Sequence, residues 1–206
     1  MVMAWMDPNA VDTDWVFGYG SLIWNPEIEF DRAELARLRG YHRAFCISST
    51  RYRGTPEQPG VVLGLDRGGS CIGIAYRLPA ASRLLSIAQL YAREVPQPEN
   101  RVYHPAIVTV QCASGEPVRA LTFVANRGIP SYRRLSDDEI LCKLTGCCGQ
   151  RGPNRDYAIN TWRALEERGV RDACLARIAQ RLLAMSGSER AADESDESGA
   201  AQRRFG

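Results

Sequence analysis

The chain has 206 residues, of which 45% are hydrophobic and 24% are charged, values typical of one globular domain. Its 26 Lys and Arg stand against 24 Asp and Glu, and because a net charge of +2 is no basic excess, we expect no nucleic-acid partner. No run of about 18 apolar residues occurs, so we expect no membrane span and no membrane partner. Residues 1–13 carry Asp7 and Asp12 and lack a cationic start before an apolar stretch, which argues against a secretory signal.

The cysteine and histidine content predicts reduced thiols and no metal site. The seven cysteines are odd in number and lie mostly within apolar runs, which favours a cytoplasmic protein over a secreted disulfide framework. His42 and His104 have no close ligand spacing and no Cys-x-x-Cys occurs, so we expect neither a metal nor another cofactor. The neighbouring Cys147 and Cys148 are interpreted as residues near a helix end, with a redox or metal role as the alternative.

Taken in chain order, the predicted elements are mostly strands first and helices last. Short β-favouring runs bounded by Gly and Pro predict six strands, at residues 15–19, 43–48, 61–65, 71–77, 102–112 and 118–125. Helices are predicted at about 81–94, 136–146, 154–168 and 171–185. Ser136 and Glu139 have the spacing of a capping box at the start of the second helix.

This order of elements indicates an α+β fold. We expect a small mixed or antiparallel β-barrel with one inserted helix and C-terminal helices. The domain is placed at residues 14–185, between a disordered N-terminal tail at 1–13 and a disordered polar C-terminal tail at 186–206.

The predicted helix at 81–94 carries a candidate base at its end. Its apolar stripe has the spacing of a buried helix face and consists of Leu84, Ile87, Ala88 and Tyr91. One further step reaches Glu94, and Pro96 ends the helix there. A carboxylate on a buried face beside the negative end of a helix is expected to have a raised pKa, which suits a general base. The alternative is that Glu94 pairs with Arg93 or Arg101, or lies in solvent.

The segment after the first strand is a candidate binding loop. Gly18 and Gly20 flank Tyr19 and are followed by Ser21 and Leu22. Glycines two residues apart permit a tight turn, and consecutive amides in such a turn can hold an anion. The dinucleotide fingerprint, the phosphate loop and the hydrolase elbow each require residues that are missing here, so Ser21 is a poor nucleophile. A plain strand-ending turn is the alternative.

Two further loops carry candidate binding residues. The polar loop at 48–60 contains Arg51 and Arg53, and arginines there could clamp a carboxylate. Solvated loop charge is the alternative. The glycine-rich segment at 149–157 opens a helix, and Tyr157 is expected to face either a site or the core.

Together these residues resemble the ChaC-type γ-glutamylcyclotransferases. The run Val16-Phe-Gly-Tyr-Gly-Ser-Leu-Ile-Trp24 looks like the substrate loop of that family, and Arg53-Gly-Thr-Pro-Glu-Gln-Pro-Gly60 resembles its next block. Tyr91-Ala-Arg-Glu94 lies where the family has its catalytic glutamate. The resemblance covers about residues 14–180. It departs at 95–101, where the mouth of the site and the substrate choice could differ, and at 146–148.

The resemblance implies an enzyme that cleaves glutathione into 5-oxoproline and cysteinylglycine, with no cofactor and no obligate protein partner. The α-amine of the γ-glutamyl group would attack its own γ-carbonyl, with Glu94 acting first as base and then as acid. The residues expected to bind the substrate are Gly18, Tyr19, Gly20, Ser21, Leu22, Ile23, Arg53 and Tyr157.

Three alternatives stay open at this point. The first is a cyclotransferase of the same fold that acts on another γ-glutamyl peptide or on a γ-glutamyl amine. The second is a binding module that has the fold without the activity. The third is a thiol redox protein that uses Cys147 and Cys148.

Overall fold

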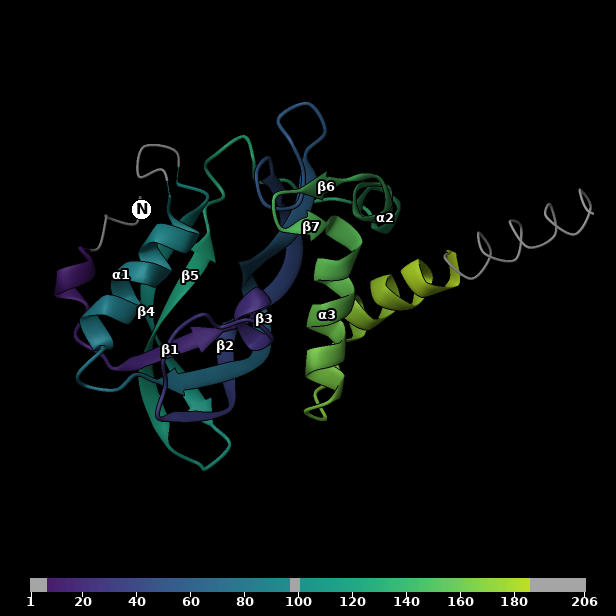
Figure 1. Cartoon of the computed structure of the whole chain (residues 1–206). Helices are drawn as coiled ribbons and strands as arrows, with labels where there is room; N and C mark the ends of the chain where they lie inside the picture. The colour runs from purple at the N-terminus through teal and green to yellow at the C-terminus, as the bar shows by residue number, and fades with distance from the viewer. Residues whose placement is uncertain (1–6, 97–100, 186–206) are drawn as a thin grey trace, which may run out of the picture.

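A closed five-stranded β-barrel forms the centre of the computed structural model, which describes residues 7–96 and 101–185 (Figure 1). The strands, in their order around the barrel, are β1 (Trp15–Gly18), β3 (Gly60–Arg77), β2 (Arg32–Ser49), β4 (Tyr103–Cys112) and β5 (Pro117–Ala125). Neighbours along this order are antiparallel, whereas β5 pairs in parallel with β1 and β3 and so closes the barrel. The predicted α+β fold with a mixed barrel is confirmed.

Strands β2 and β3 form one long hairpin. Their pairing runs from Arg32 opposite Arg77 to Ser49 opposite Gly60. The strand predicted at 43–48 is therefore too short, because β2 begins eleven residues earlier, at Arg32. Residues 32–42 are rich in Ala, Leu, Glu and Arg, which favour helices in isolation. Pairing with β3 on one side and β4 on the other overrides this local preference.

The strands predicted at 61–65 and 71–77 are two parts of β3. Gly68 and Gly69 between them have φ angles of 102° and 70°, which the sequence suggests as a turn. They form a strand irregularity instead, opposite Gly40, whose φ is 83°. A pair of glycines in the left-handed region suits a bulge as well as a turn, and only the partner strand distinguishes the two.

Helix α1 (Arg83–Glu94) ends at Glu94, as predicted. Its buried apolar side chains are Ile87, Leu90 and Tyr91. Of the predicted stripe, Ile87 and Tyr91 are confirmed as buried, whereas Leu84 is 56% exposed and Ala88 is also exposed. The buried face still leads to Glu94 at helical spacing. Each large apolar side chain on it contributes about 1.5–3 kcal/mol by leaving water.

The last third of the described chain is helical. Its elements are α2 (Asp137–Gly146), the short pair β6 (Cys148–Gly149) and β7 (Gly152–Pro153), α3 (Asn154–Glu166) and a helix at 173–185. The predicted capping box is confirmed, since Ser136 and Glu139 each bond the backbone amide of the other. In Figure 1, α1 covers one side of the barrel, and α3 and the last helix lie on the other. Within 7–96 and 101–185, no helix is long and apolar enough to cross a membrane.

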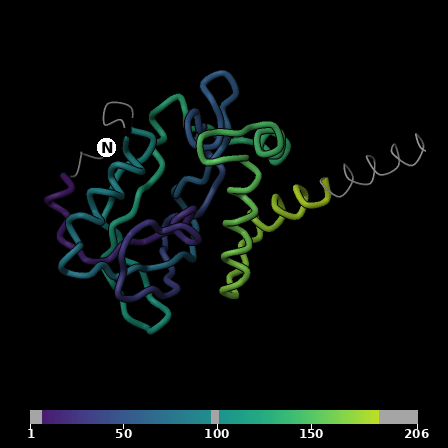
Figure 2. Tube along the Cα trace, in the orientation of Figure 1, coloured from purple at the N-terminus to yellow at the C-terminus, as the bar shows by residue number. Residues whose placement is uncertain are grey.

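The described part of the predicted N-terminal tail packs against the domain. Residues 8–10 form η1 (Pro8–Ala10), which lies beside α1 in Figure 2. Val11 is buried, and its carbonyl oxygen accepts a hydrogen bond from Nη1 of Arg83 at 2.8 Å. Thr13 is buried as well. The sequence predicts disorder up to residue 13, whereas residues 8–13 make these contacts with the domain. The predicted tail at 186–206 lies outside the described residues.

Candidate active site

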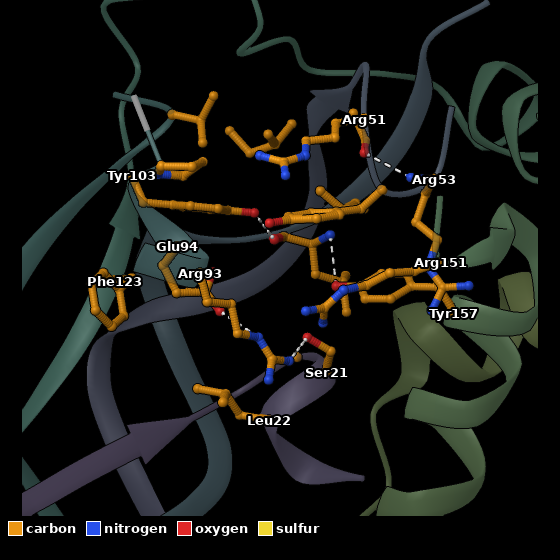
Figure 3. A pocket seen from close by; sticks show the side chains of 18 of the residues that line it. Ser21, Leu22, Arg51, Arg53, Arg93, Glu94, Tyr103, Phe123, Arg151 and Tyr157 are labelled. Atoms are coloured by element: carbon orange, nitrogen blue, oxygen red, sulfur yellow. Dashed lines mark hydrogen bonds and ion pairs between the residues drawn. The ribbon is translucent and has the colours of Figure 1, made fainter. Parts of the chain in front are cut away.

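A cavity of about 500 Å³ lies between the end of α1, the loop that joins β2 and β3, and α3 (Figure 3). This volume is within the range of about 300–1,000 Å³ that small-molecule sites occupy. The lining comes from segments that are far apart in the sequence, including the glycine loop after β1, the last turn of α1 and the start of α3. Most of the predicted site residues are thereby brought together.

Glu94 faces this cavity with 18% of its side chain exposed. Burial raises the pKa of its carboxyl group, and the guanidiniums of Arg93 and Arg151 oppose this effect without reversing it. Glu27, a second acid in the lining, behaves differently. Burial raises the pKa of Glu27 too, but a hydrogen bond from Asn25 and the same two guanidiniums bring it below the ordinary value. Two carboxyl groups in one site with pKa values pushed apart are suited to different roles, and Glu94 is suited to be the base.

Arg93 holds the end of α1 against the glycine loop. Its Nε lies 3.3 Å from Oε1 of Glu94, and its Nη2 donates to Oγ of Ser21 at 2.8 Å. Its Nη1 donates to the carbonyl oxygen of Asn25 and to the carboxylate of Glu27, both at 2.9 Å. A planar guanidinium has several donors in a rigid arrangement, so one side chain sets all these positions. The ion pair between Glu94 and Arg93, which the sequence offered as an alternative to a catalytic role, is thus present, and the pKa of Glu94 is raised in spite of it.

The glycine loop turns into a short 3-10 helix, η2 (Ser21–Ile23), at the cavity. The amide of Ile23 donates to the carbonyl oxygen of Gly20 at 3.0 Å, whereas the amides of Ser21 and Leu22 come too early in the helix for such a bond. These two amides have no acceptor among residues 7–96 and 101–185, and both residues line the cavity.

The predicted loop residues divide into two groups. Four of them line the cavity, namely Tyr19, Gly20, Ser21 and Leu22. Gly18 and Ile23 lie outside the lining. A Cβ atom on Gly18 would be 2.8 Å from Cβ of Leu22, so glycine is needed there for packing. Ile23 is buried in the core between the barrel and the C-terminal helices.

Three tyrosine hydroxyls lie on the inner wall. Tyr19 donates to the carbonyl oxygen of Phe123 and Tyr103 donates to that of Leu63, both at 2.8 Å. Tyr157 instead accepts from the amide of Leu63 at 3.1 Å. Burial raises the pKa of all three phenols, so they are protonated at neutral pH. Within the described part of the chain the Tyr157 hydroxyl has no acceptor, and its proton is available to a bound molecule.

Arg53 lines the cavity mainly as part of its wall. The side chain is buried, and Nη1 donates to the carbonyl oxygen of Pro153 at 3.0 Å. The guanidinium lies over the rings of Tyr157 and Trp24, at 5.6 and 6.0 Å from their centroids. Its Nε and Nη2 have no acceptor among residues 7–96 and 101–185, and the expected carboxylate clamp stays a prediction. Arg151 lines the same cavity and was not predicted, because an arginine in a glycine-rich turn has no periodicity that reveals where it points.

Comparison with known proteins identifies the family. The sequence matches the family described as ChaC-like protein over residues 14–184. The chain belongs to the ChaC-like family. This ChaC-like chain is 35% identical over 159 residues to an Escherichia coli K12 protein named glutathione-specific gamma-glutamylcyclotransferase, which covers 77% of the chain and 68% of that protein. It is 31% identical over 160 residues to a human protein named glutathione-specific gamma-glutamylcyclotransferase 1, which covers 74% and 68%.

A solved structure shows the same fold as this ChaC-like protein. It is described as a gamma-glutamyl cyclotransferase specific to glutathione from yeast, and it superposes with a TM-score of 0.72 at 20% identity, over 82% of this chain and 94% of that one. The predicted family and its barrel fold are confirmed. The roles of individual site residues remain predictions.

The neighbouring cysteines of this ChaC-like protein fit the helix-end interpretation. Cys147 is the C-cap of α2 and is buried, with Sγ 3.5 Å from the carbonyl oxygen of Pro59. Burial raises the pKa of its thiol, which opposes the reactive thiolate that a redox role requires.

Proposed function

We propose that this protein is a γ-glutamylcyclotransferase that converts glutathione to 5-oxoproline and cysteinylglycine. The names of its bacterial and human relatives support this function. The observation that carries it is the presence, in one cavity, of a largely buried Glu94 with a raised pKa and of the free amides of Ser21 and Leu22. A base and an anion-binding turn are what a γ-glutamyl group, with its α-amine and α-carboxylate, requires.

The γ-glutamyl end of the substrate binds between these two features. The amides at the start of η2 receive the α-carboxylate, because backbone donors at a helical start favour an anion. We expect the neighbouring α-ammonium then to meet the Glu94 carboxylate, because both features line the same cavity. Binding then needs only to hold a few rotatable bonds so that the amine approaches the γ-carbonyl of the same molecule.

The reaction is an intramolecular acyl transfer. Glu94 removes a proton from the α-ammonium, and the free amine attacks the γ-carbonyl carbon. A new C–N bond closes the five-membered ring of 5-oxoproline, and the C–N bond to the cysteinyl residue breaks. The protonated Glu94 gives this proton to the leaving nitrogen as that bond breaks. The regenerated Glu94 carboxylate then takes the second proton from the ring nitrogen and passes it to the released amine, so that cysteinylglycine leaves as an ammonium. The reaction requires neither a water molecule nor a second acidic residue, because the substrate supplies every atom of both products and Glu94 transfers the protons.

Charge that develops on the carbonyl oxygen requires a donor. We assign this role to the Tyr157 hydroxyl, because it accepts a hydrogen bond from the amide of Leu63 and retains its own proton for the bound molecule. Tyr157 lies close to Gly20 of the glycine loop, which brings this donor and the anion-binding turn together.

We further propose a cytoplasmic location, which the seven free thiols support. That the protein acts without a cofactor and without a nucleic-acid, membrane or protein partner stays a prediction. A different γ-glutamyl peptide or a γ-glutamyl amine is the second candidate substrate. The departure from the family pattern at 95–101 favours testing it, although 97–100 lie outside the described residues.

The test is an end-point assay on the purified full chain. The protein is incubated with glutathione without added metal, and products are identified by mass spectrometry. Equal amounts of 5-oxoproline and cysteinylglycine are expected. Release of glutamate instead would mean that water is the nucleophile and would contradict the mechanism. If glutathione persists, γ-glutamyl-lysine and γ-glutamyl-alanine test the second candidate, and no turnover of any of them would favour a binding module.

A further inference from the structure

The cavity has more basic than acidic side chains, and two of its guanidiniums have no acidic partner among residues 7–96 and 101–185. The bases are Arg51, Arg53, Arg93 and Arg151, and the acids are Glu27 and Glu94. Arg93 pairs with both acids, and Arg151 lies 3.2 Å from Glu27. Arg53 is buried in the wall, where its Nη1 donates to the carbonyl oxygen of Pro153 and not to a carboxylate. Among residues 7–96 and 101–185, Arg51 contacts no carboxylate, so the cavity contains a positive charge that the protein does not neutralise.

Two loops that are bonded to each other carry Arg51 and Arg151. The amide of Gln150 donates to the carbonyl oxygen of Arg51 at 2.9 Å, and the amide of Arg151 donates to that of Tyr52 at 3.0 Å. The side-chain oxygen of Gln150 also accepts from Nε of Arg51 at 3.1 Å. This contact orients the Arg51 guanidinium and leaves both of its terminal amino groups for another acceptor.

The ring of Tyr52 supports both guanidiniums. The central carbon of Arg51 lies 5.2 Å from the ring centroid, and that of Arg151 lies 4.7 Å from it. Stacking on an aromatic ring limits the freedom of an arginine while its edge can still donate. Figure 3 shows Arg51 and Arg151 entering the cavity from a different side than Glu94, and both are exposed in part.

We propose that Arg51 and Arg151 bind the C-terminal carboxylate of a γ-glutamyl peptide and so select peptides over γ-glutamyl amines and esters. The inference rests on the proposed function, because it requires the γ-glutamyl end of the substrate at Glu94. A tripeptide then extends about 10 Å from the reacting amine, away from the last turn of α1. Arginines bind carboxylates through paired hydrogen bonds, which makes them suited to this second acidic group of glutathione.

The experiment compares glutathione with its ethyl ester at the glycine carboxylate. The ester has the same reacting atoms and lacks only the proposed ligand of the arginines. For the wild-type protein we expect kcat/KM to be about tenfold to a hundredfold higher for glutathione, as for a hydrogen-bonded charge. In Arg51→Gln this preference should disappear, through a higher KM for glutathione and an unchanged kcat/KM for the ester. Arg51→Lys should restore part of it.

A matched control removes one positive charge outside the cavity. Arg39 is exposed on β2, and Arg39→Gln should retain the full preference for glutathione. The same preference retained in both Arg51→Gln and Arg151→Gln would overturn the proposal, as would equal kcat/KM for glutathione and its ester in the wild type. In the latter case the proposed function stands, because 5-oxoproline still forms.

A binding measurement separates this proposal from the proposed function. Titration calorimetry of the Glu94→Gln variant compares the Kd of glutathione and of the ester, before and after Arg51→Gln. Tighter binding of glutathione that depends on Arg51 would support the arginine site even if no 5-oxoproline formed. Equal Kd values for glutathione and the ester would overturn the arginine site independently of turnover. No detectable binding of either compound would overturn it as well.

Discussion

Burial of Glu94 has opposite effects on its strength as a base and on the stability of the folded protein. Its side chain is 18% exposed, and burial raises the pKa of the carboxyl because the charged form loses water. The same environment that makes the carboxylate a stronger base makes the folded state less stable when Glu94 is charged. If Glu94 is the proposed base, the raised pKa favours the reaction while it lowers the stability of the folded state at neutral pH.

Replacing Glu94 by Gln tests the catalytic role. Gln has nearly the same shape but cannot accept the proton, so we expect kcat to fall by roughly 10²–10⁴-fold or more with the fold unchanged. Steady-state release of 5-oxoproline from glutathione measures this. Glu166→Gln at the exposed end of α3 is the matched control and should leave kcat unchanged. Activity near wild type in Glu94→Gln would mean that another group is the base.

The same variant tests the pKa shift through stability. A carboxyl whose pKa is raised on folding binds protons more tightly in the native state, so its contribution to stability is present at low pH and is lost as pH rises through the folded-state pKa. Glu94→Gln should therefore unfold at a higher urea concentration than wild type at neutral pH. The difference should shrink toward the ordinary pKa of a glutamate. A difference that does not change with pH would contradict the raised pKa.

Gly20 is needed where the loop approaches Tyr157. A Cβ atom there would lie 3.2 Å from the Tyr157 hydroxyl oxygen, which is tight for a carbon–oxygen contact. We expect Gly20→Ala to lower kcat/KM for glutathione by about tenfold, equivalent to about 1.4 kcal/mol of binding or transition-state energy. In a Tyr157→Phe background the oxygen is absent, so the alanine should cost little more. Additive effects of the two changes would exclude this contact as the cause.

At the scale of structural elements, backbone hydrogen bonds hold two loops together. The β2–β3 loop and the β6–β7 turn are far apart in the sequence, yet backbone hydrogen bonds join residues 51–52 to residues 150–151. Gly149 makes this approach possible, since a Cβ atom there would lie 2.5–2.6 Å from backbone atoms of Tyr52, Arg53 and Gly54. The arrangement of the arginines in the cavity thus depends on a glycine that does not itself line the cavity.

Gly149→Ala should separate these loops. Backbone atoms cannot move aside as a side chain can, so we expect a lower thermal midpoint and a KM for glutathione raised severalfold or more. Gly146→Ala is the matched control, because the nearest atom to its Cβ would be the end of the Gln58 side chain at 3.5 Å. Its thermal midpoint and KM should match those of the wild type. Equal behaviour of the two variants would show that the loop contact is not needed.

The barrel is covered by α1 on one side and by the C-terminal helices on the other, and a buried ion pair joins the second layer to it. Arg43 of β2 is buried and bonds Asp172, which precedes the last helix and is 20% exposed. The same guanidinium donates to the carbonyl oxygens of Tyr19 and Ile72. A buried guanidinium such as that of Arg43 stabilises the fold only while its carboxylate partner, Asp172, is present.

Asp172→Ala should leave the Arg43 charge buried without its partner. We expect the free energy of unfolding to fall by about 2–3 kcal/mol, less than for a fully buried pair because Asp172 retains some contact with water. Urea unfolding measures this. Asp138→Ala is the control, since its carboxylate forms an exposed pair with Arg181 and should contribute little. A loss no greater than in the control would show that Arg43 is satisfied by the backbone carbonyls alone.

Much of the candidate site follows from local signals in the sequence. Pro96 ends α1 at Glu94 through a steric clash with the preceding residue, and Gly18 and Gly20 permit the turn that presents the η2 amides. Such signals act over a few residues, so they are readable without knowledge of the fold. Ile87 and Tyr91 are buried as predicted, but the prediction of a buried Leu84 is wrong, because Leu84 and Leu90 are equally apolar and only the barrel decides which is covered.

Tertiary structure alone decided the features that depend on distant partners. Gly68 and Gly69 are part of β3 because β2 lies opposite them, and Val11 is buried because α1 is beside it. Arg151 reaches the cavity because its loop bonds residues 51–52, about one hundred positions earlier in the chain. Local signals in the sequence predict the end of α1 at Glu94, the proposed base, and the turn that is proposed to bind the anion. The arginines that meet the far end of the substrate are determined by long-range pairing, which no local pattern records.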